Sequence, residues 1–333
     1  MDWFKPISCW NHNVFNVKEL KRIAEGLEWK LGLEIVEREI LFYDTMYTLF
    51  SYFPRILIAG GGSIINRVFI KDSVRFSFDI DATALEPLEG KAQLLMDILD
   101  LNVEIENLMN ILQISGREIR IGEFTLDTEK NFFPNIISLK RIVPSVTFGT
   151  HLPTYLKSRY NIDTSSSSFS KWFMDLKDEV GFMPCIEEIR IEIGFSRKGF
   201  EGEYYEVDVD SLISRIEAPR LRLRCKVSTI EYSIVSKLLS LSRKYSNIIL
   251  QDMVRDLCDL QMFKQPINKD RLRKLIEKNN VNLGEVKENI EILLRNGEEI
   301  FMSSWHFTLV RRKYSWSEIC KSALKEIKTL YNT

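Results

Sequence analysis

Residues 56–81, "ILIAGGGSIINRVFIKDSVRFSFDID", constrain the fold more than any other stretch of the sequence. A short apolar strand, "RILIAG", runs into three glycines and a serine, and "SIINRVFIK" then has the apolar spacing of one short helix. "RFSFDIDATAL" alternates apolar and polar residues with the period of a strand. The segment therefore predicts a strand, a glycine loop, a helix and a second strand in close succession.

The remaining sequence predicts a mixed sheet between helices. Residues 17–52 have the spacing of two helices, and an apolar helix is expected over residues 91–112. Four β-type runs follow: "REIRIGEFTLD", "IEEIRIEIGFSR", "YYEVDVDSLI" and "PRLRLRCKVS". Helical spacing dominates from Thr229 onward. We expect an α+β fold, in which residues 1–228 form a core with N-terminal helices and residues 229–333 form a C-terminal helical domain.

Composition excludes several classes of protein. The chain is 45% hydrophobic and 28% charged, as in ordinary globular proteins. No apolar run approaches the roughly 18 to 20 residues that span a bilayer, and the start lacks a basic stretch followed by an apolar one, so we expect a soluble, cytoplasmic protein without a membrane partner. Five scattered cysteines and three histidines indicate neither disulfides nor a zinc site, which leaves carboxylates to hold any metal. The net charge of −1 gives no overall attraction to nucleic acid.

The glycine loop has the composition of a phosphate-binding turn. Glycines let backbone N–H groups approach an anion closely, and the start of a helix favours negative charge. The loop is not a Walker A motif, because no G-K-[ST] follows, and Ile65 stands where a dinucleotide fingerprint needs its third glycine. A purely structural turn is the alternative.

Two aspartates follow in the second strand. Side chains alternate faces along a strand, so Asp79 and Asp81 share one face, about 7 Å apart at Cα. That separation suits two carboxylates that hold one or two Mg²⁺ ions. A solvated strand face is the alternative, although aspartate is a poor strand former.

These residues resemble a known family. Gly61, Gly62, Ser63 and Arg67, followed by "RFSFDID", resemble the first two motifs of the polymerase-β-like nucleotidyltransferase superfamily. The R-x-S-x-D-x-D form is similar to the AbiEii branch, which comprises abortive-infection toxins and their MenT-type relatives. The later motifs of this family are matched by Lys237 and Arg243 in K-x5-R spacing, and by "RDLCD", which contains Asp256 and Asp259.

The resemblance implies a polymerase-β-like core and a Mg²⁺-dependent nucleotidyltransferase, with Mn²⁺ as an alternative metal and a nucleoside triphosphate (NTP) as substrate. The implied catalytic residues are Asp79, Asp81, Lys237 and Asp256; the implied nucleotide-binding residues are Gly61, Gly62, Ser63, Arg67, Lys237, Arg243 and Asp259. It also implies an RNA acceptor, in particular the 3′ end of tRNA, and a toxin with a cognate antitoxin protein. A nucleotide- or RNA-binding module without catalysis, a partner-binding protein, and a transferase acting on protein or a small molecule are the alternatives.

The residues around Lys237 support a charged site independently. Lys237 lies at the edge of an apolar helical stripe, where an unpaired ammonium would be costly, so it needs an anion. A snorkelling side chain or a structural ion pair is the alternative. Asp252, Asp256 and Asp259 fall at i, i+4 and i+7, and a pair between Arg255 and Asp259 would be their structural explanation.

Three further stretches of the sequence carry predictions, and two of them have an alternative interpretation. Glu192, on the polar face of "IEEIRIEIGFS", is a candidate third metal ligand, or the partner of Arg190. The cations of residues 220–226 line one strand face and suit an RNA backbone, unless the acids of residues 206–210 neutralise them. The serines of residues 164–168 are typical of an inserted, mobile surface loop.

Overall fold

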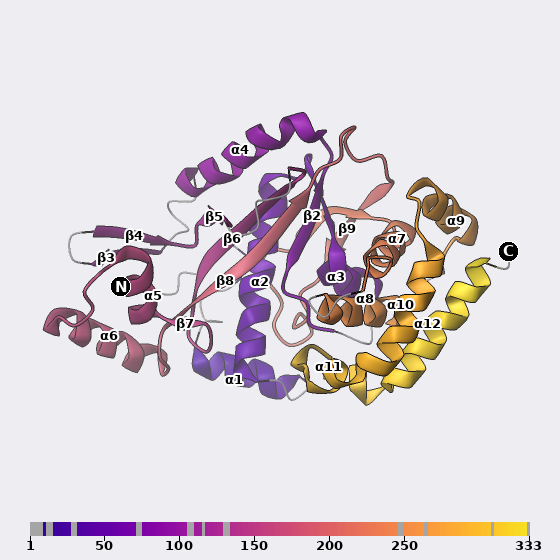
Figure 1. The fold of residues 1–333 in the computed structure, drawn as a ribbon. Helices are drawn as coiled ribbons and strands as arrows, with labels where there is room; N and C mark the ends of the chain where they lie inside the picture. The colour runs from indigo at the N-terminus through magenta and orange to yellow at the C-terminus, as the bar shows by residue number, and fades with distance from the viewer. Residues whose placement is uncertain are drawn as a thin grey trace. The chain divides into compact units, whose positions relative to one another are not determined.

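The computed structural model describes residues 9–10, 16–27, 32–70, 75–104, 110–114, 117–128, 134–245, 249–262, 266–307 and 310–331. The chain forms two compact units that alternate along the sequence (Figure 1). The first unit comprises Met1–Leu57, Phe78–Phe200 and Asp208–Cys225, and the second comprises Ile58–Ser77, Glu201–Val207 and Lys226–Thr333. The glycine loop therefore belongs to the same unit as the C-terminal helices.

The first unit contains a mixed sheet with strand β8 at its centre. Its strands are β2 (Ile80–Ala84), β5 (Phe124–Leu126), β6 (Ile136–Ser145), β7 (Thr150–His151) and β8 (Cys185–Gly194). β8 pairs in parallel with β2 and antiparallel with β6 and β7, and β6 pairs antiparallel with β5. β3 (Asn110–Ile114) and β4 (Arg117–Ile121) form a separate antiparallel pair. The mixed sheet of an α+β fold is confirmed.

Helix α2 organises the first unit. The helices here are α1 (Val17–Gly26), α2 (Leu33–Tyr52), the short η3 (Leu88–Gly90), α4 (Lys91–Glu104), α5 (Leu152–Tyr160) and α6 (Ser167–Val180). α2 is buried along most of its length, and its buried polar side chains hold other segments. The Tyr43 hydroxyl donates to the carbonyl of Val209 at 2.8 Å and accepts from the N–H of Leu223 at 2.9 Å. Asp44 pairs with the buried Arg141 on β6 at 3.3 Å.

The second unit is mainly helical. It contains most of β1 (Leu57–Gly60), which pairs in parallel with the second half of β10 (Leu223–Ser228), and the first part of β9 (Tyr204–Val209). Its helices are α3 (Gly61–Ile64), the π-helix η2 (Ile65–Phe69), α7 (Ile230–Leu241), α8 (Leu250–Met262), α9 (Lys269–Lys278), α10 (Leu283–Asn296), α11 (Glu298–Ser303) and α12 (Trp316–Tyr331), with 3₁₀ turns η5 (Trp305–Phe307) and η6 (Val310–Arg312). Ile65 and Phe69 pack in one core with apolar residues of α7, α8, α10 and α12. This packing fixes the segment after the glycine loop to the C-terminal helices.

Several predicted boundaries were wrong. β2 begins at Ile80, whereas the alternation starts at Arg75, because the backbone N–H of Arg75 is bound by the Asn66 side chain instead of a neighbouring strand. The helix expected over residues 91–112 ends at Glu104, and residues 110–114 form β3. β6 was not predicted, since Pro144 and two central cations interrupt its apolar pattern.

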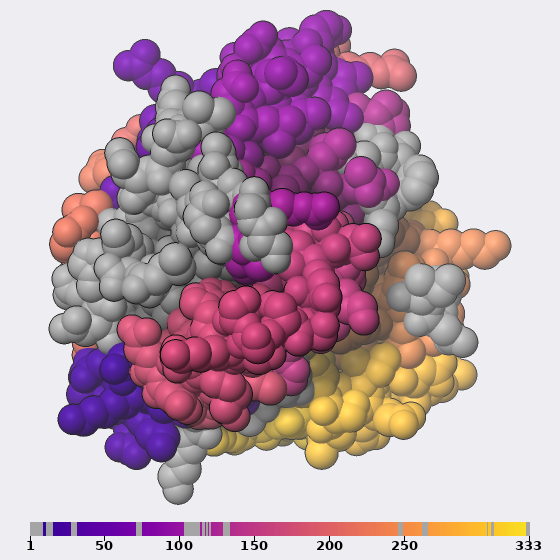
Figure 2. Space-filling model, turned by 90° about the vertical axis from the view of Figure 1, so that its left-hand side faces the viewer, coloured from indigo at the N-terminus to yellow at the C-terminus, as the bar shows by residue number. Residues whose placement is uncertain are grey.

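The serine stretch was expected to be an inserted, mobile surface loop, but it contains the start of a helix. The Ser166 side chain accepts a hydrogen bond from the N–H of Phe169 at 3.2 Å and caps α6, which begins at Ser167. A serine at this position satisfies one of the first N–H groups of a helix, so the serine density marks a helix start. The stretch is surface-exposed, and the α5–α6 region is the pink segment in the face that Figure 2 shows.

Within the described residues, none of the helices combines the length and the hydropathy needed to cross a membrane.

Candidate active site

Two of the three loop glycines are required by the geometry. Gly61 has φ +68°, in the left-handed region that side chains rarely adopt. A Cβ added to Gly62 would lie 2.4 Å from Nη2 of Arg75 and 3.1 Å from Oδ2 of Asp259. Gly60 is extended, and a Cβ added there would meet none of the described atoms within 4 Å. Gly61 and Gly62 are thus the specialised positions.

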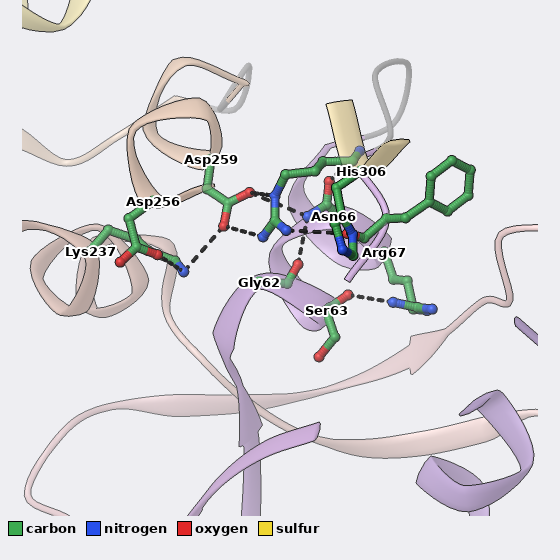
Figure 3. A network of polar contacts seen from close by, with 10 residues as sticks. Gly62, Ser63, Asn66, Arg67, Lys237, Asp256, Asp259 and His306 are labelled. Carbon is green, nitrogen blue, oxygen red and sulfur yellow. Dashed lines mark hydrogen bonds and ion pairs between the residues drawn. The ribbon is translucent and has the colours of Figure 1, made fainter. Parts of the chain in front are cut away.

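The loop is fastened by the residues that follow it (Figure 3). Asn66 Nδ2 donates to the carbonyl oxygen of Gly62 at 2.6 Å, and its Oδ1 accepts from the N–H of Arg75 at 2.9 Å. Arg67 Nη1 donates to the carbonyl oxygen of Ser63 at 3.0 Å. The Ser63 hydroxyl is buried, and no hydrogen-bond partner for it exists within the described part of the chain. A buried hydroxyl without a partner is costly, which makes it a candidate ligand-binding group.

Behind the loop lies a buried cluster of four charges. Arg75 binds Asp259 through two hydrogen bonds of 2.8 Å, and their side chains are 2% and 0% exposed. Lys237 Nζ lies 2.5 Å from Oδ1 of Asp256 and 3.1 Å from Oδ2 of Asp259 (Figure 3). Lys237 was expected to need an anion, and in this structure Asp256 and Asp259 supply it. This arrangement is the structural ion pair that the sequence analysis gave as an alternative.

The charges in this cluster stabilise one another. Burial alone would raise the pKa of Asp259, but Arg75 and Lys237 outweigh burial and hold that pKa below its usual value. Burial would lower the pKa of Lys237, but Asp256 and Asp259 outweigh it and raise that pKa. Asp259 and Lys237 are therefore both charged near neutral pH.

The first unit holds the candidate metal ligands. Asp81 on β2 is the register partner of Glu192 on β8, and partners in adjacent strands point to the same face. Their neighbours Ile80 and Ile191 are buried, whereas Asp81 and Glu192 are partly exposed. Asp79 directly precedes β2 and is also partly exposed. The register therefore places Glu192, the candidate third metal ligand, on the same face of the sheet as Asp81.

These carboxylates fit the donor chemistry of Mg²⁺. Mg²⁺ prefers oxygen ligands and is commonly held by one or two carboxylates together with substrate phosphates. No group of three or more His, Cys, Asp or Glu side chains in the described residues is arranged to hold a metal by itself. Asp79 and Asp81 have the carboxylate chemistry of the one or two protein ligands that such a phosphate-assisted site requires.

Other candidate residues lie differently from the sequence interpretation. α7 ends at Leu241, so the exposed Arg243 lies beyond the helix that contains Lys237. Arg255 pairs with Asp252 and not with Asp259, because Arg75 and Lys237 occupy that carboxylate.

The basic strand is shorter than expected and partly neutralised. β10 begins at Leu223, so Arg220 and Arg222 precede it. Arg224 pairs with Asp208 at 3.6 Å, and both side chains are more than half exposed. Lys226 Nζ lies 5.2 Å from the ring centroid of Tyr204. For Arg224 the structure agrees with neutralisation by the neighbouring acidic strand.

Sequence reasoning missed Arg75 and Asn66 as members of this site. Arg75 is the first residue of the R-x-S-x-D-x-D motif, which was its only signal. Its partner Asp259 lies 184 residues away, and no local spacing reveals such a pair.

Comparison with known proteins gave similar solved structures, of which three are described here. No family model matches the chain, and no curated protein matches it. A candidate nucleotidyltransferase from H. pylori has 11% identity and a TM-score of 0.46, over 91% of this chain and 96% of that one. JHP933 from Helicobacter pylori has 10% identity and a TM-score of 0.43, over 91% and 94%. MenT4, a nucleotidyltransferase toxin from Mycobacterium tuberculosis, has 12% identity and a TM-score of 0.41, over 93% and 96%.

Proposed function

We propose that this protein is a Mg²⁺-dependent nucleotidyltransferase, which transfers a nucleoside monophosphate from an NTP to an acceptor hydroxyl. The observation that carries the proposal is the link between the glycine loop and Lys237. Gly62 packs against Arg75, Arg75 forms an ion pair with Asp259, and Asp259 forms an ion pair with Lys237. Two side chains therefore connect a phosphate-type loop to a lysine suited to phosphate.

The loop would bind the triphosphate. Its glycines allow close approach of the backbone, and the buried hydroxyl of Ser63 would gain a partner in a phosphate oxygen. Arg67 binds the loop through the Ser63 carbonyl, so its guanidinium would place a positive charge beside the phosphates.

Lys237 would stabilise the leaving pyrophosphate. A phosphate would compete with Asp256 for its ammonium, while Asp259 would keep the side chain aimed at the same place. Asp256, whose side chain is 11% exposed, would then be released to accept the proton of the attacking hydroxyl. The acceptor oxygen forms a bond to the α-phosphorus, the bond to pyrophosphate breaks, and that proton passes to the carboxylate.

Asp79 and Asp81 would hold Mg²⁺, with Glu192 as a further ligand and Mn²⁺ as an alternative ion. The ion would neutralise phosphate charge and orient the triphosphate. For the acceptor we propose RNA, specifically the 3′ end of tRNA, and for the biological role a toxin of a type IV toxin–antitoxin pair. Both rest on the motif resemblance of Gly61–Ser63, Asp79, Asp81 and Lys237.

The test is label transfer from each of the four α-³²P NTPs in the presence of Mg²⁺. Separate reactions contain tRNA, RNA depleted of tRNA, or protein as acceptor. Wild type is compared with Asp81→Asn and with Glu188→Gln, a control acid on β8 that pairs with Lys140. We expect labelled tRNA from wild type and the control, and none from Asp81→Asn.

Other outcomes have defined meanings. Label on protein or on other RNA would keep the reaction and replace the acceptor. Nucleotide binding without label or pyrophosphate release in any reaction would overturn the enzymatic proposal in favour of a binding module.

A further inference from the structure

We propose that Arg75 is a positioning residue that holds the glycine loop and, through Asp259, Lys237 in one binding-competent arrangement. The inference rests on the proposed function, since the arrangement matters only if the loop and Lys237 act on a nucleotide. It assigns to Asp259 a role behind the site instead of direct contact with the nucleotide, which was the sequence-based expectation.

The contacts of Asp259 argue against direct binding. Its side chain is 0% exposed, Oδ1 accepts from Arg75 Nε and from Asn66 Nδ2, and Oδ2 accepts from Arg75 Nη2 and Lys237. A buried carboxylate with both oxygens occupied has no free position for a ligand, and its charge would repel phosphate. Asp259 therefore acts through the two cations that it holds.

Arg75 reaches the loop through two contacts. Its Nη2 lies where a Cβ of residue 62 would be, so the loop backbone packs directly on the guanidinium. Its backbone N–H donates to Asn66, which in turn donates to the carbonyl of Gly62. A displacement of Arg75 would therefore move the loop through a packing contact and through a hydrogen bond.

The segment that bears Arg75 is itself anchored. His306 Nδ1, on η5, donates to the carbonyl oxygen of Phe76 at 3.0 Å, and Arg75 Nη1 donates to the same oxygen at 3.2 Å. Arg75 is thus fixed at its backbone N–H by Asn66 and at its side chain by Asp259, and His306 fixes the backbone of the next residue, Phe76. Bidentate arginine–carboxylate pairs have a fixed planar geometry, which suits this orienting role better than a single lysine contact.

The test measures KM for NTP and kcat in Asn66→Ala and Arg75→Lys. Asn66→Ala removes the hydrogen bonds of Asn66 to Gly62, to the N–H of Arg75 and to Asp259, but it removes neither partner of the buried ion pairs. Arg75→Lys keeps the charge but loses the bidentate contact. Asp252→Asn is the control, because Asp252 lies on the same helix α8 but pairs with Arg255, outside the buried cluster. NTP affinity without acceptor and melting temperature are measured alongside.

We expect Asn66→Ala to raise KM and the dissociation constant for NTP about tenfold, with kcat within about threefold, because a loop that grips phosphate equally before and during reaction contributes to binding. Arg75→Lys should raise KM and also lower kcat, since Lys237 loses its alignment. The control should match wild type.

The proposal is overturned if folded Asn66→Ala binds NTP with the affinity of wild type. It is also overturned if this variant has a lower melting temperature but an unchanged KM, because that result indicates a purely structural role. Should Arg75→Lys not fold, Asn66→Ala alone decides. A wild type that neither binds nor transfers nucleotide removes the proposed function and this inference together, whereas an active wild type with unaffected variants removes only this inference.

Discussion

Arg75 and Asp259, separated by 184 residues, are joined by two hydrogen bonds of 2.8 Å in the interior of the second unit. The pair connects the segment after the glycine loop to helix α8, and Lys237 completes it from α7. A buried cluster of ion pairs is weak evidence for stability, because the cost of desolvating the charges offsets much of their attraction. Its position behind the loop indicates a role in arranging the site.

Gly60 and Gly62 of the glycine loop should respond differently to substitution by alanine. We expect Gly60→Ala to keep wild-type activity and stability, because it adds a Cβ in open space on extended backbone. Gly62→Ala should lower nucleotide affinity and destabilise the protein by about 1 to 3 kcal/mol, because the buried Arg75 cannot move away without leaving Asp259. Denaturant unfolding and NTP binding check both. Equal effects at the two positions would show that the loop is held differently.

Asp259→Asn should give a pH-dependent loss of stability. The folded pKa of Asp259 is below its usual 3.8, so its charge contributes stability above that value, and the contribution is lost as the pH falls through the folded pKa. We expect a deficit of about 3 to 5 kcal/mol near neutral pH, since two buried cations lose a partner. Urea unfolding from pH 7 to below 3 should show the deficit shrinking at the acid end. A deficit independent of pH would mean that Asp259 is not ionised in the folded protein.

Local patterns predicted the elements but not their connections. The glycine loop, the two N-terminal helices and α7 were readable because their signals repeat within a few residues. The partner of Lys237 was not readable, since Asp256 and Asp259 reach it only when α7 and α8 pack together. The mixed sheet was predicted from its β-type runs, whereas β6 was missed because the buried Arg141 within it looks like a surface residue until Asp44 is seen beside it.

Glu192 should influence metal affinity if it completes the site with Asp81. We expect Glu192→Gln to raise the Mg²⁺ concentration for half-maximal activity about tenfold. Glu188→Gln, four residues earlier on β8 and paired with Lys140, should leave it unchanged. Activity titrated with Mg²⁺ after EDTA treatment measures both. An identical Mg²⁺ requirement in wild type and Glu192→Gln would exclude Glu192 as a ligand.

Ser166 should stabilise the protein as a helix cap. We expect Ser166→Ala to lower the unfolding free energy by about 1 kcal/mol, because the N–H of Phe169 loses its side-chain acceptor. Ser167→Ala, at the exposed first residue of α6, is the matched control and should have no such cost. Thermal unfolding distinguishes the two variants. Equal stability would show that Ser166 does not stabilise the protein as a helix cap.

The position of the label decides whether the chemistry is nucleotidyl transfer. The same NTP is supplied once with ³²P at the α-phosphate and once at the γ-phosphate, with Mg²⁺ and tRNA. Nucleotidyl transfer places the α label on the acceptor and the γ label in pyrophosphate, in equal amounts. A γ label on the acceptor, or release of pyrophosphate without any labelled acceptor, would contradict the function proposed for Asp81, Lys237 and the glycine loop.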